Sequence, residues 1–177
     1  MTRYLLADTH FGDPGPLEYA DRPFDSVGAM NDALVERWNA AVSEGDEVVV
    51  VGDFAVPAEP TTLRRWLRRL SGDVVLVAGD HDDGARRCRP LDVRASYRLE
   101  AGGHRLTCVH DPGDDPPDRE GWLVHGHHHD RPGEFPFVDP GSRRANVAVE
   151  RTGYGPVAVD ELVDYLDDGE RLPSRPD

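Results

Sequence analysis

The sequence predicts an α/β protein with a single domain, and three observations support this. Short apolar runs rich in valine and leucine alternate with segments of helical periodicity. Most of these runs end in glycine, aspartate or histidine, and no repeat or change in composition divides the chain. At 177 residues the chain is long enough to bury a core of its own. We expect a domain at residues 1–168 and a polar C-terminal tail at 169–177, which we expect to fray.

The strands are predicted from runs of β-branched and other apolar residues. These runs are residues 3–8, 47–53, 74–80, 105–110, 122–127 and 146–150. The sequence Ala101-Gly102-Gly103 separates two alternating runs and predicts a hairpin, so the sheets should be mixed. A last short strand is expected at residues 157–159, whereas 111–120 and 128–142 have the composition of loops.

Three helices are predicted, at residues 26–42, 61–70 and 160–168. The first follows a serine cap signal and places five side chains on one face: Val27, Met30, Leu34, Trp38 and Ala41. The second places Leu63, Trp66, Leu67 and Leu70 on one face. Its four arginines, Arg64, Arg65, Arg68 and Arg69, form the other face, which we interpret as solvated rather than phosphate-binding.

The composition is acidic, with 34 acidic and 20 basic residues and a net charge of -14. All the basic residues are arginine, which favours a halophilic source over the alternative of a GC-rich genome alone. At about 1 M salt the screening length falls to about 3 Å, so the net charge does not by itself exclude a nucleic-acid partner. We expect a cytoplasmic protein because we find neither a membrane span nor a signal peptide. The two cysteines, Cys88 and Cys108, predict free thiols.

Potential metal ligands follow five separate strand-like runs. They are Asp8, His10, Asp53, Asp80, His110, His127 and His129. Because the carboxyl ends of strands in α/β sheets converge on one crevice, we expect these side chains to meet. Oxygen and nitrogen donors without thiolate suit Mn²⁺, Fe or Zn²⁺ better than Mg²⁺ or Ca²⁺. Seven ligands fill two ion sites if one carboxylate is shared, and two ions about 3.5–4 Å apart suit in-line phosphoryl displacement.

With these motifs the chain resembles the calcineurin-like metallophosphoesterases. The family pattern is Asp-x-His, Gly-Asp, Gly-Asn-His-Asp/Glu, His and Gly-His-x-His, and the resemblance runs from about residue 3 to about residue 165. The segments Asp8–Gly12, Arg22–Phe24 and Gly52–Phe54 further resemble a small bacterial and archaeal branch of predicted phosphoesterases. The resemblance implies a four-layer αββα fold with two packed mixed sheets, and hydrolysis of a phosphate monoester or diester by a metal-bridging hydroxide.

Carried over to this chain, the resemblance also implies roles for individual residues. Asp8, His10 and His129 would hold one ion, and Asp80, His110 and His127 the other, with Asp53 between them. His81 would protonate the leaving group, a task suited to an imidazole. Asp82 would orient His81.

The chain departs from the family pattern at Asp80, where asparagine is usual. The carboxylate offers acceptors alone and reduces the formal charge of a two-ion site from +2 to +1 before the hydroxide is counted. Asp13 stands where the narrower branch more often has histidine, so a phosphate contact would be missing. The segment 54–57 also lacks the arginine of the protein phosphatases. Arg22, Arg143 or Arg144 are the candidates to replace that arginine's contact.

The other histidines have simpler interpretations: His104 is exposed, His125 lies in the core or behind the ligands, and His128 is a candidate for touching substrate. Three functions compete. The first is an active hydrolase of a small phosphate ester or nucleotide. The second is a non-catalytic protein-binding module on the same fold. The third is a nuclease subunit, which the absence of an accessory nucleic-acid domain disfavours.

Overall fold

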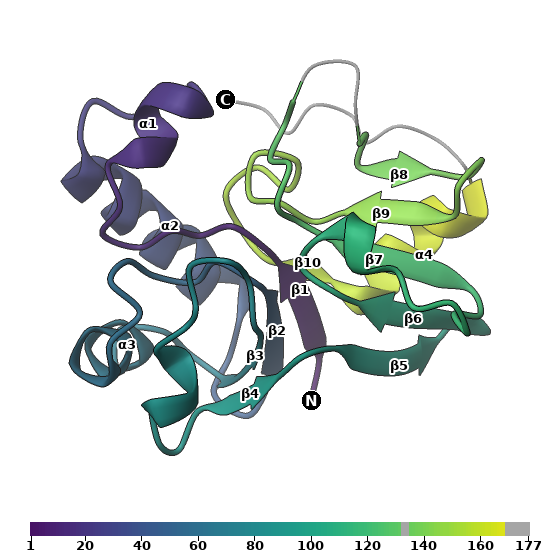
Figure 1. Cartoon of the computed structure of the whole chain (residues 1–177), viewed down its shortest axis with the longest axis horizontal. Helices are drawn as coiled ribbons and strands as arrows, with labels where there is room; N and C mark the ends of the chain where they lie inside the picture. The colour runs from purple at the N-terminus through teal and green to yellow at the C-terminus, as the bar shows by residue number, and fades with distance from the viewer. Residues whose placement is uncertain (132–134, 169–177) are drawn as a thin grey trace.

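The computed structural model describes residues 1–131 and 135–168 as two five-stranded sheets with flanking helices (Figure 1). The tail expected at 169–177 lies outside the described residues. The first sheet has the order β10-β1-β2-β3-β4. Its strands are β1 (Arg3–Leu6), β2 (Glu47–Val51), β3 (Asp73–Val77), β4 (Asp92–Arg94) and β10 (Val157–Ala158). β1 to β4 are parallel, and β10 pairs with β1 in the antiparallel direction.

The second sheet has the order β5-β6-β7-β9-β8. Its strands are β5 (Tyr97–Ala101), β6 (His104–Cys108), β7 (Trp122–His125), β8 (Val138–Asp139) and β9 (Arg144–Asn146). β6, β7 and β9 are parallel, whereas β5 and β8 run antiparallel to their neighbours. The hairpin predicted at the two glycines joins β5 to β6, and both sheets are mixed, as the sequence predicted.

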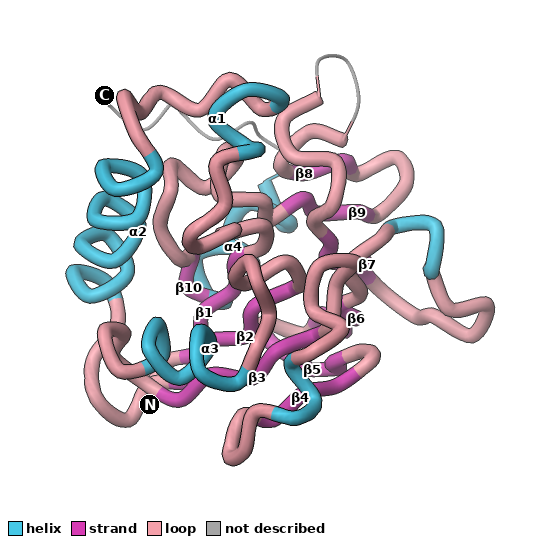
Figure 2. Tube along the Cα trace, turned by 60° about the vertical axis from the view of Figure 1, so that its left-hand side comes forward, coloured by secondary structure: helices cyan, strands magenta, loops and turns pink. Residues whose placement is uncertain are grey.

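Helices α2 (Val27–Ala41) and α3 (Pro60–Leu67) pack on one face of the first sheet, on the side away from the second sheet (Figures 1 and 2). Ser26 caps α2 by accepting a hydrogen bond from the Ala29 amide at 3.1 Å. The buried face of α2 consists of Met30, Asn31, Leu34 and Trp38, whereas Ala41 is exposed, contrary to the expected face. Helix α3 ends at Leu67, three residues before the predicted end.

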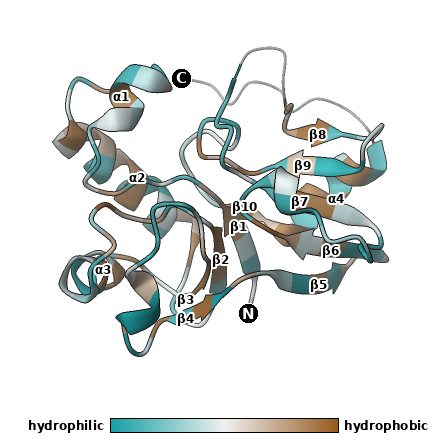
Figure 3. Ribbon diagram, viewed as in Figure 1, coloured by the Kyte–Doolittle hydropathy of each residue, from teal (hydrophilic) through white to brown (hydrophobic). Residues whose placement is uncertain are grey.

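The core between the sheets follows from the alternation of side chains along the strands. Leu5 of β1 faces the second sheet, and Leu6 faces α2 and α3. The continuous valine run of β2 is hydrophobic throughout in Figure 3, because both faces of this central strand are covered. Helix α4 (Val159–Asp168) adds Leu162 and Leu166 to the core between the sheets.

Several elements were not predicted from the sequence: α1 (Gly15–Tyr19), β4, β8 and two short 3₁₀ turns, Ala85–Arg87 and Pro112–Asp114. The strand predicted at 146–150 was misplaced, because β9 covers Arg144–Asn146 and shares only Asn146 with the predicted range. The following residues cross to the first sheet, where Ala148 forms a parallel bridge with Ala7. This crossing brings the end of β1 against the second sheet. Within the described residues, no helix is long and apolar enough to traverse a bilayer.

Candidate metal centre

All seven predicted ligands lie where strands of the two sheets end. Asp8 and His10 follow β1, Asp53 follows β2, and Asp80 follows β3. His110, His127 and His129 follow β6 and β7 of the second sheet. Their donor atoms form overlapping groups in which all atoms lie within 4.8 Å of one another. The sequence therefore predicted correctly which residues the fold brings together.

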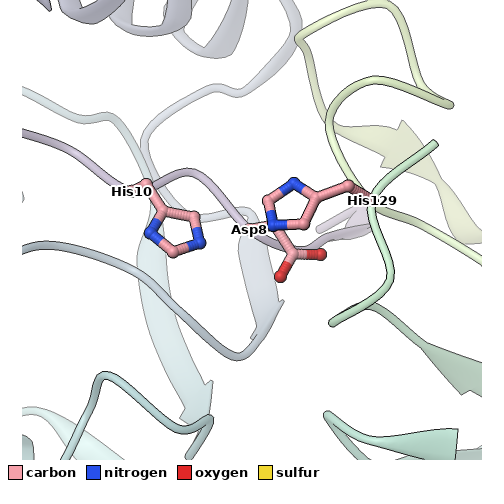
Figure 4. Close-up of side chains that lie close together, drawn as sticks. All are labelled: Asp8, His10 and His129. Atoms are coloured by element: carbon pink, nitrogen blue, oxygen red, sulfur yellow. The ribbon is translucent and has the colours of Figure 1, made fainter. Parts of the chain in front are cut away.

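The first group consists of Asp8, His10 and His129 (Figure 4). Asp8 and His10 are buried, and Nε2 of His10 has no hydrogen-bond partner among the described residues. An unpaired buried nitrogen is costly unless something else binds it. Burial lowers the pKa of His10 to about 4, so its imidazole is neutral and able to bind a metal.

The second group consists of Asp80, His110 and His127. Nδ1 of His127 lies 3.3 Å from Nε2 of His110 and 3.5 Å from Oδ2 of Asp80. Nδ1 of His110 is 2.9 Å from the Val51 carbonyl oxygen, which leaves Nε2 for a ligand. This group is more open than the first, because the side chains of Asp80 and His127 are 63% and 28% exposed.

Asp53 lies between the two groups. Its Oδ2 is 3.5 Å from Nε2 of His10 in the first group and 3.2 Å from Nε2 of His110 in the second. Its Oδ1 accepts a hydrogen bond from the His81 amide at 2.9 Å. One carboxylate oxygen therefore has a donor atom from each group beside it, which is the placement that a shared ligand requires.

Glycines allow these side chains to approach so closely. A Cβ atom at Gly52 would lie 2.0 Å from Nδ1 of His110, and one at Gly79 would lie 2.5 Å from Oδ1 of Asp53. At Gly126 it would lie 2.4 Å from Oδ2 of Asp8. Each glycine immediately precedes a predicted ligand, so the Gly-Asp and Gly-His pairs of the sequence have a steric cause.

The backbone of the ligands themselves is strained. Five of them have a positive φ, namely Asp8, His10, Asp53, His127 and His129. This left-handed conformation is uncommon for residues other than glycine, and such residues cluster at functional sites because the surrounding structure has to hold them.

A second sphere of carboxylates orients the histidines of the first group. Nδ1 of His129 lies 2.8 Å from Oε1 of Glu150, and Nδ1 of His10 lies 3.1 Å from Oδ2 of Asp13. In this arrangement the outer nitrogen donates to a carboxylate and Nε2 turns toward the metal position. Asp13 stands where we expected a phosphate contact to be missing, and its carboxylate contacts a ligand instead.

Arg22 joins the two loops that carry the first group. Its guanidinium donates to the backbone oxygens of Asp8 and Thr9, and Nε donates to Glu150 at 2.8 Å. The side chains of Arg22 and Glu150 are 0% and 2% exposed. Arg22 is therefore not available to bind substrate phosphate, as we had considered. Glu150, which lies four residues after the end of β9, was not identified from the sequence.

Asp82 has a different role from the expected one. It is buried, and its Oδ2 accepts hydrogen bonds from the amides of Asp53 and Gly79 at 2.8 and 2.9 Å. Its Oδ1 accepts one from Phe54 at 3.2 Å. The carboxylate joins the loops after β2 and β3, and its bonds lead to backbone rather than to His81.

Of the remaining candidates, some line the cleft at the metal groups and the others lie away from it. His81 and His128 line a cleft of about 680 Å³ above the metal groups, and the ring of His81 lies 5.2 Å from that of His10. His125 is buried, as expected, and burial lowers its pKa to about 4. His104, expected to be exposed, is 2.7 Å from Asp167. Arg143 and Arg144 lie at the start of β9, away from the strand ends that carry the ligands.

Known proteins are similar to this chain in sequence and in fold. The sequence model of the calcineurin-like phosphoesterases matches residues 1–163. An uncharacterized protein of Methanocaldococcus jannaschii, MJ1445, is 32% identical over 170 residues, which cover 94% of this chain and 92% of the relative. The crystal structure of AQ665 from Aquifex aeolicus, a protein of unknown function, superimposes with a TM-score of 0.73 at 21% identity. That match covers 93% of this chain and 98% of the other.

Replacing Asp82 with asparagine should destabilise the protein without affecting a proton-transfer step. The amide nitrogen of asparagine would face backbone N–H groups that now donate hydrogen bonds to the carboxylate. Leaving such buried donors unpaired lowers the free energy of unfolding by about 1–3 kcal/mol. Denaturant unfolding of the metal-free protein measures this loss. Asp83→Asn is the matched control because Asp83 is exposed. Equal stability of the two variants would show that the Asp82 carboxylate does not stabilise the loops after β2 and β3.

Glu150→Gln should weaken the first metal position alone, by roughly ten- to a hundredfold in affinity, as is typical for second-sphere partners. The substitution keeps the size of the side chain but removes the charge that faces His129 and Arg22. A Mn²⁺ titration with two resolved binding steps is the measurement. Glu44→Gln, at an exposed position, serves as the control. Equal weakening of both steps would show that Glu150 affects folding in general rather than one position.

Metal affinity should rise with pH. Burial raises the pKa of Asp8 to about 7. Burial alone would lower the pKa of His110, but its hydrogen bond to Asp53 and the nearby carboxylates outweigh burial and raise the pKa to about 9. Both groups must lose a proton to bind a metal, so protons compete below these values. Titrations at a series of pH values between 6 and 9 should show tighter Mn²⁺ binding at each higher pH. A constant affinity would contradict this competition.

Proposed function

Since this chain belongs to the calcineurin-like phosphoesterase family, we propose that it is a hydrolase of phosphate esters that uses two divalent metal ions. Asp8, His10 and His129 would hold one ion, and Asp80, His110 and His127 the other. Asp53 would be shared between them. The observation that carries the proposal is the position of Asp53 Oδ2, which has a histidine nitrogen from each group at 3.5 and 3.2 Å.

The chemistry divides between the ions and the chain. Two bound ions supply Lewis acidity at the phosphate and a nucleophile formed from water at neutral pH. His81 would donate a proton to the oxygen of the leaving group, because its ring lines the cleft beside His10. The hydrogen bond from the backbone amide of His81 to Asp53 fixes the loop that carries this ring. His128, on the same cleft, would contact the substrate.

The oxygen and nitrogen donors suit Mn²⁺, with Fe or Zn²⁺ as alternatives. The acidic, lysine-free composition supports a protein adapted to high salt, so assays belong in concentrated salt. A cytoplasmic location stays a prediction.

The direct test is hydrolysis by metal-free protein supplied with Mn²⁺, Zn²⁺ or Mg²⁺. One p-nitrophenyl phosphomonoester and one bis-p-nitrophenyl phosphodiester, in high salt, cover both ester classes. We expect activity with Mn²⁺ against at least one of them. Absence of hydrolysis with every metal would reject the enzyme and favour the protein-binding module.

Asp53→Ala should impair both metal positions, whereas His110→Ala should empty one. The reason is that Asp53 contacts both groups and His110 belongs to the second. Metal content after equilibration at a concentration that saturates the wild type decides the matter: near two equivalents for wild type, one for His110→Ala and fewer for Asp53→Ala. If Asp53→Ala retains two equivalents at wild-type affinity, Asp53 is not the shared ligand.

Asp80→Asn should keep both metals and shift activity toward monoesters. Amide and carboxylate oxygens are similar in size, but the amide restores a formal +2 site and adds a donor for the phosphate. One such hydrogen bond is typically worth about 1.5–3 kcal/mol, or roughly ten- to a hundredfold in rate if it forms in the transition state alone. The measurement is the monoester-to-diester ratio of kcat/KM, compared with Asp83→Asn. An unchanged ratio would mean that Asp80 does not select substrate.

A further inference from the structure

One aromatic side chain at the metal cleft has no role in the site described so far. Among the described residues, the exposed large hydrophobic side chains are Met1 and Tyr19, at 92% and 59%. Met1 is the chain terminus, whereas Tyr19 ends helix α1 and lines the cleft above the metal groups. Aromatic side chains that line a cleft commonly contact the ligand bound there.

The ring of Tyr19 stands beside the first metal group. Its centroid lies 5.3 Å from that of His129 and 6.4 Å from that of His10, and it is nearly perpendicular to both, at 75° and 77°. A flat group attached to a phosphate bound between the metal groups would therefore come within reach of the tyrosine face.

Helix α1 holds the ring in place by its connection to the metal site. Asp13 accepts a hydrogen bond from the Gly15 amide through Oδ1 and contacts His10 through Oδ2. A Cβ atom at Gly15 would lie 3.0 Å from Cε1 of Tyr19, so the ring packs over this glycine. The position of Tyr19 is thus fixed relative to a ligand histidine. A pre-positioned ring loses little entropy when a second ring stacks on it.

The charges around the cleft restrict what the ring can bind. Besides Asp53, three carboxylates line the cleft, those of Asp21, Asp80 and Asp130, and the strongly basic side chain among its lining residues is Arg131. A second phosphate or an acidic peptide would be repelled by these carboxylates. An uncharged group with hydroxyl or amino donors would find acceptors there instead.

We propose that Tyr19 is a stacking platform that selects phosphate esters whose organic group is a flat, uncharged ring system, of which a nucleoside is the biological form. The inference rests on the proposed function, because the phosphate must be held by the metal groups for the ring to meet Tyr19. Stacking of one base on an aromatic side chain contributes roughly ten- to a hundredfold in affinity.

Binding of two phosphonates tests the proposal: the analogues of adenosine 5′-monophosphate and of ribose 5-phosphate in which carbon replaces the bridging oxygen. Neither can be cleaved there, and they differ at the anomeric carbon, which carries adenine in the first compound and a hydroxyl group in the second. Calorimetry with Mn²⁺-loaded protein in high salt should show the adenosine compound binding roughly ten- to a hundredfold more tightly. Tyr19→Phe should keep this ratio, and Tyr19→Ala should reduce it to near one at unchanged Mn²⁺ content.

The outcomes separate this inference from the proposed function. Equal binding of the two compounds by wild type, no binding of either, or a ratio retained in Tyr19→Ala would each overturn the stacking role. A ratio lost in Tyr19→Phe as well would assign the effect to the hydroxyl and also overturn it. Failure to hydrolyse any ester with any metal would reject the enzyme, whereas the ratio of the two affinities would still decide the role of Tyr19.

Discussion

The burial of two carboxylates against each other is the constraint on which the rest of this structure depends. Asp8 and Asp53 lie in one group with His110, and all three are almost entirely removed from solvent. Burying such charges without a partner is expensive. In the absence of a metal, protons reduce this cost. Burial raises the pKa of Asp8 to about 7. At His110 the hydrogen bond to Asp53 and the nearby carboxylates outweigh burial and raise the pKa to about 9. Divalent cations bound to the same carboxylates would offset this cost, and their binding free energy would then contribute to the stability of the fold.

The fold holds these ligands at a conformational cost. Five ligands adopt left-handed backbone, and sparsely populated conformations cost on the order of 1–3 kcal/mol each. Such strain persists because bonds outside the ligand set fix the loops. The Arg22–Glu150 pair ties the loop after β1 to the segment after β9, and Asp82 ties the loop after β2 to the loop after β3. Each pair of loops is therefore fixed by a carboxylate that does not itself belong to the predicted metal groups.

The sequence identified the side chains that the fold brings together because their signal is local. A valine-rich run followed by glycine and aspartate is visible within a few residues, and parallel strands bring such endings together without further information. The second sphere was missed because Arg22 and Glu150 are 128 residues apart and their pairing depends on the crossing at Ala148. The family resemblance implied that Asp82 orients His81, but the side chains of adjacent residues diverge, and the buried carboxylate of Asp82 accepts hydrogen bonds from backbone amides instead. Short elements such as α1 and β4 carry too few residues to show a period.

The two metal groups differ in their exposure to solvent. In the first group, His10 and His129 donate to the carboxylates of Asp13 and Glu150, and Arg22 donates to the backbone oxygen of Asp8, so these ligands are held by several bonds. In the second group, the Asp80 side chain is 63% exposed and His127 faces the cleft. A charge in contact with water is screened by salt more than a buried one. The extra negative charge of Asp80 therefore lies where a salt-rich solvent reduces its effect on an approaching phosphate. The negative charges of Asp53 and Asp8 are not screened in this way, because both side chains are buried away from solvent.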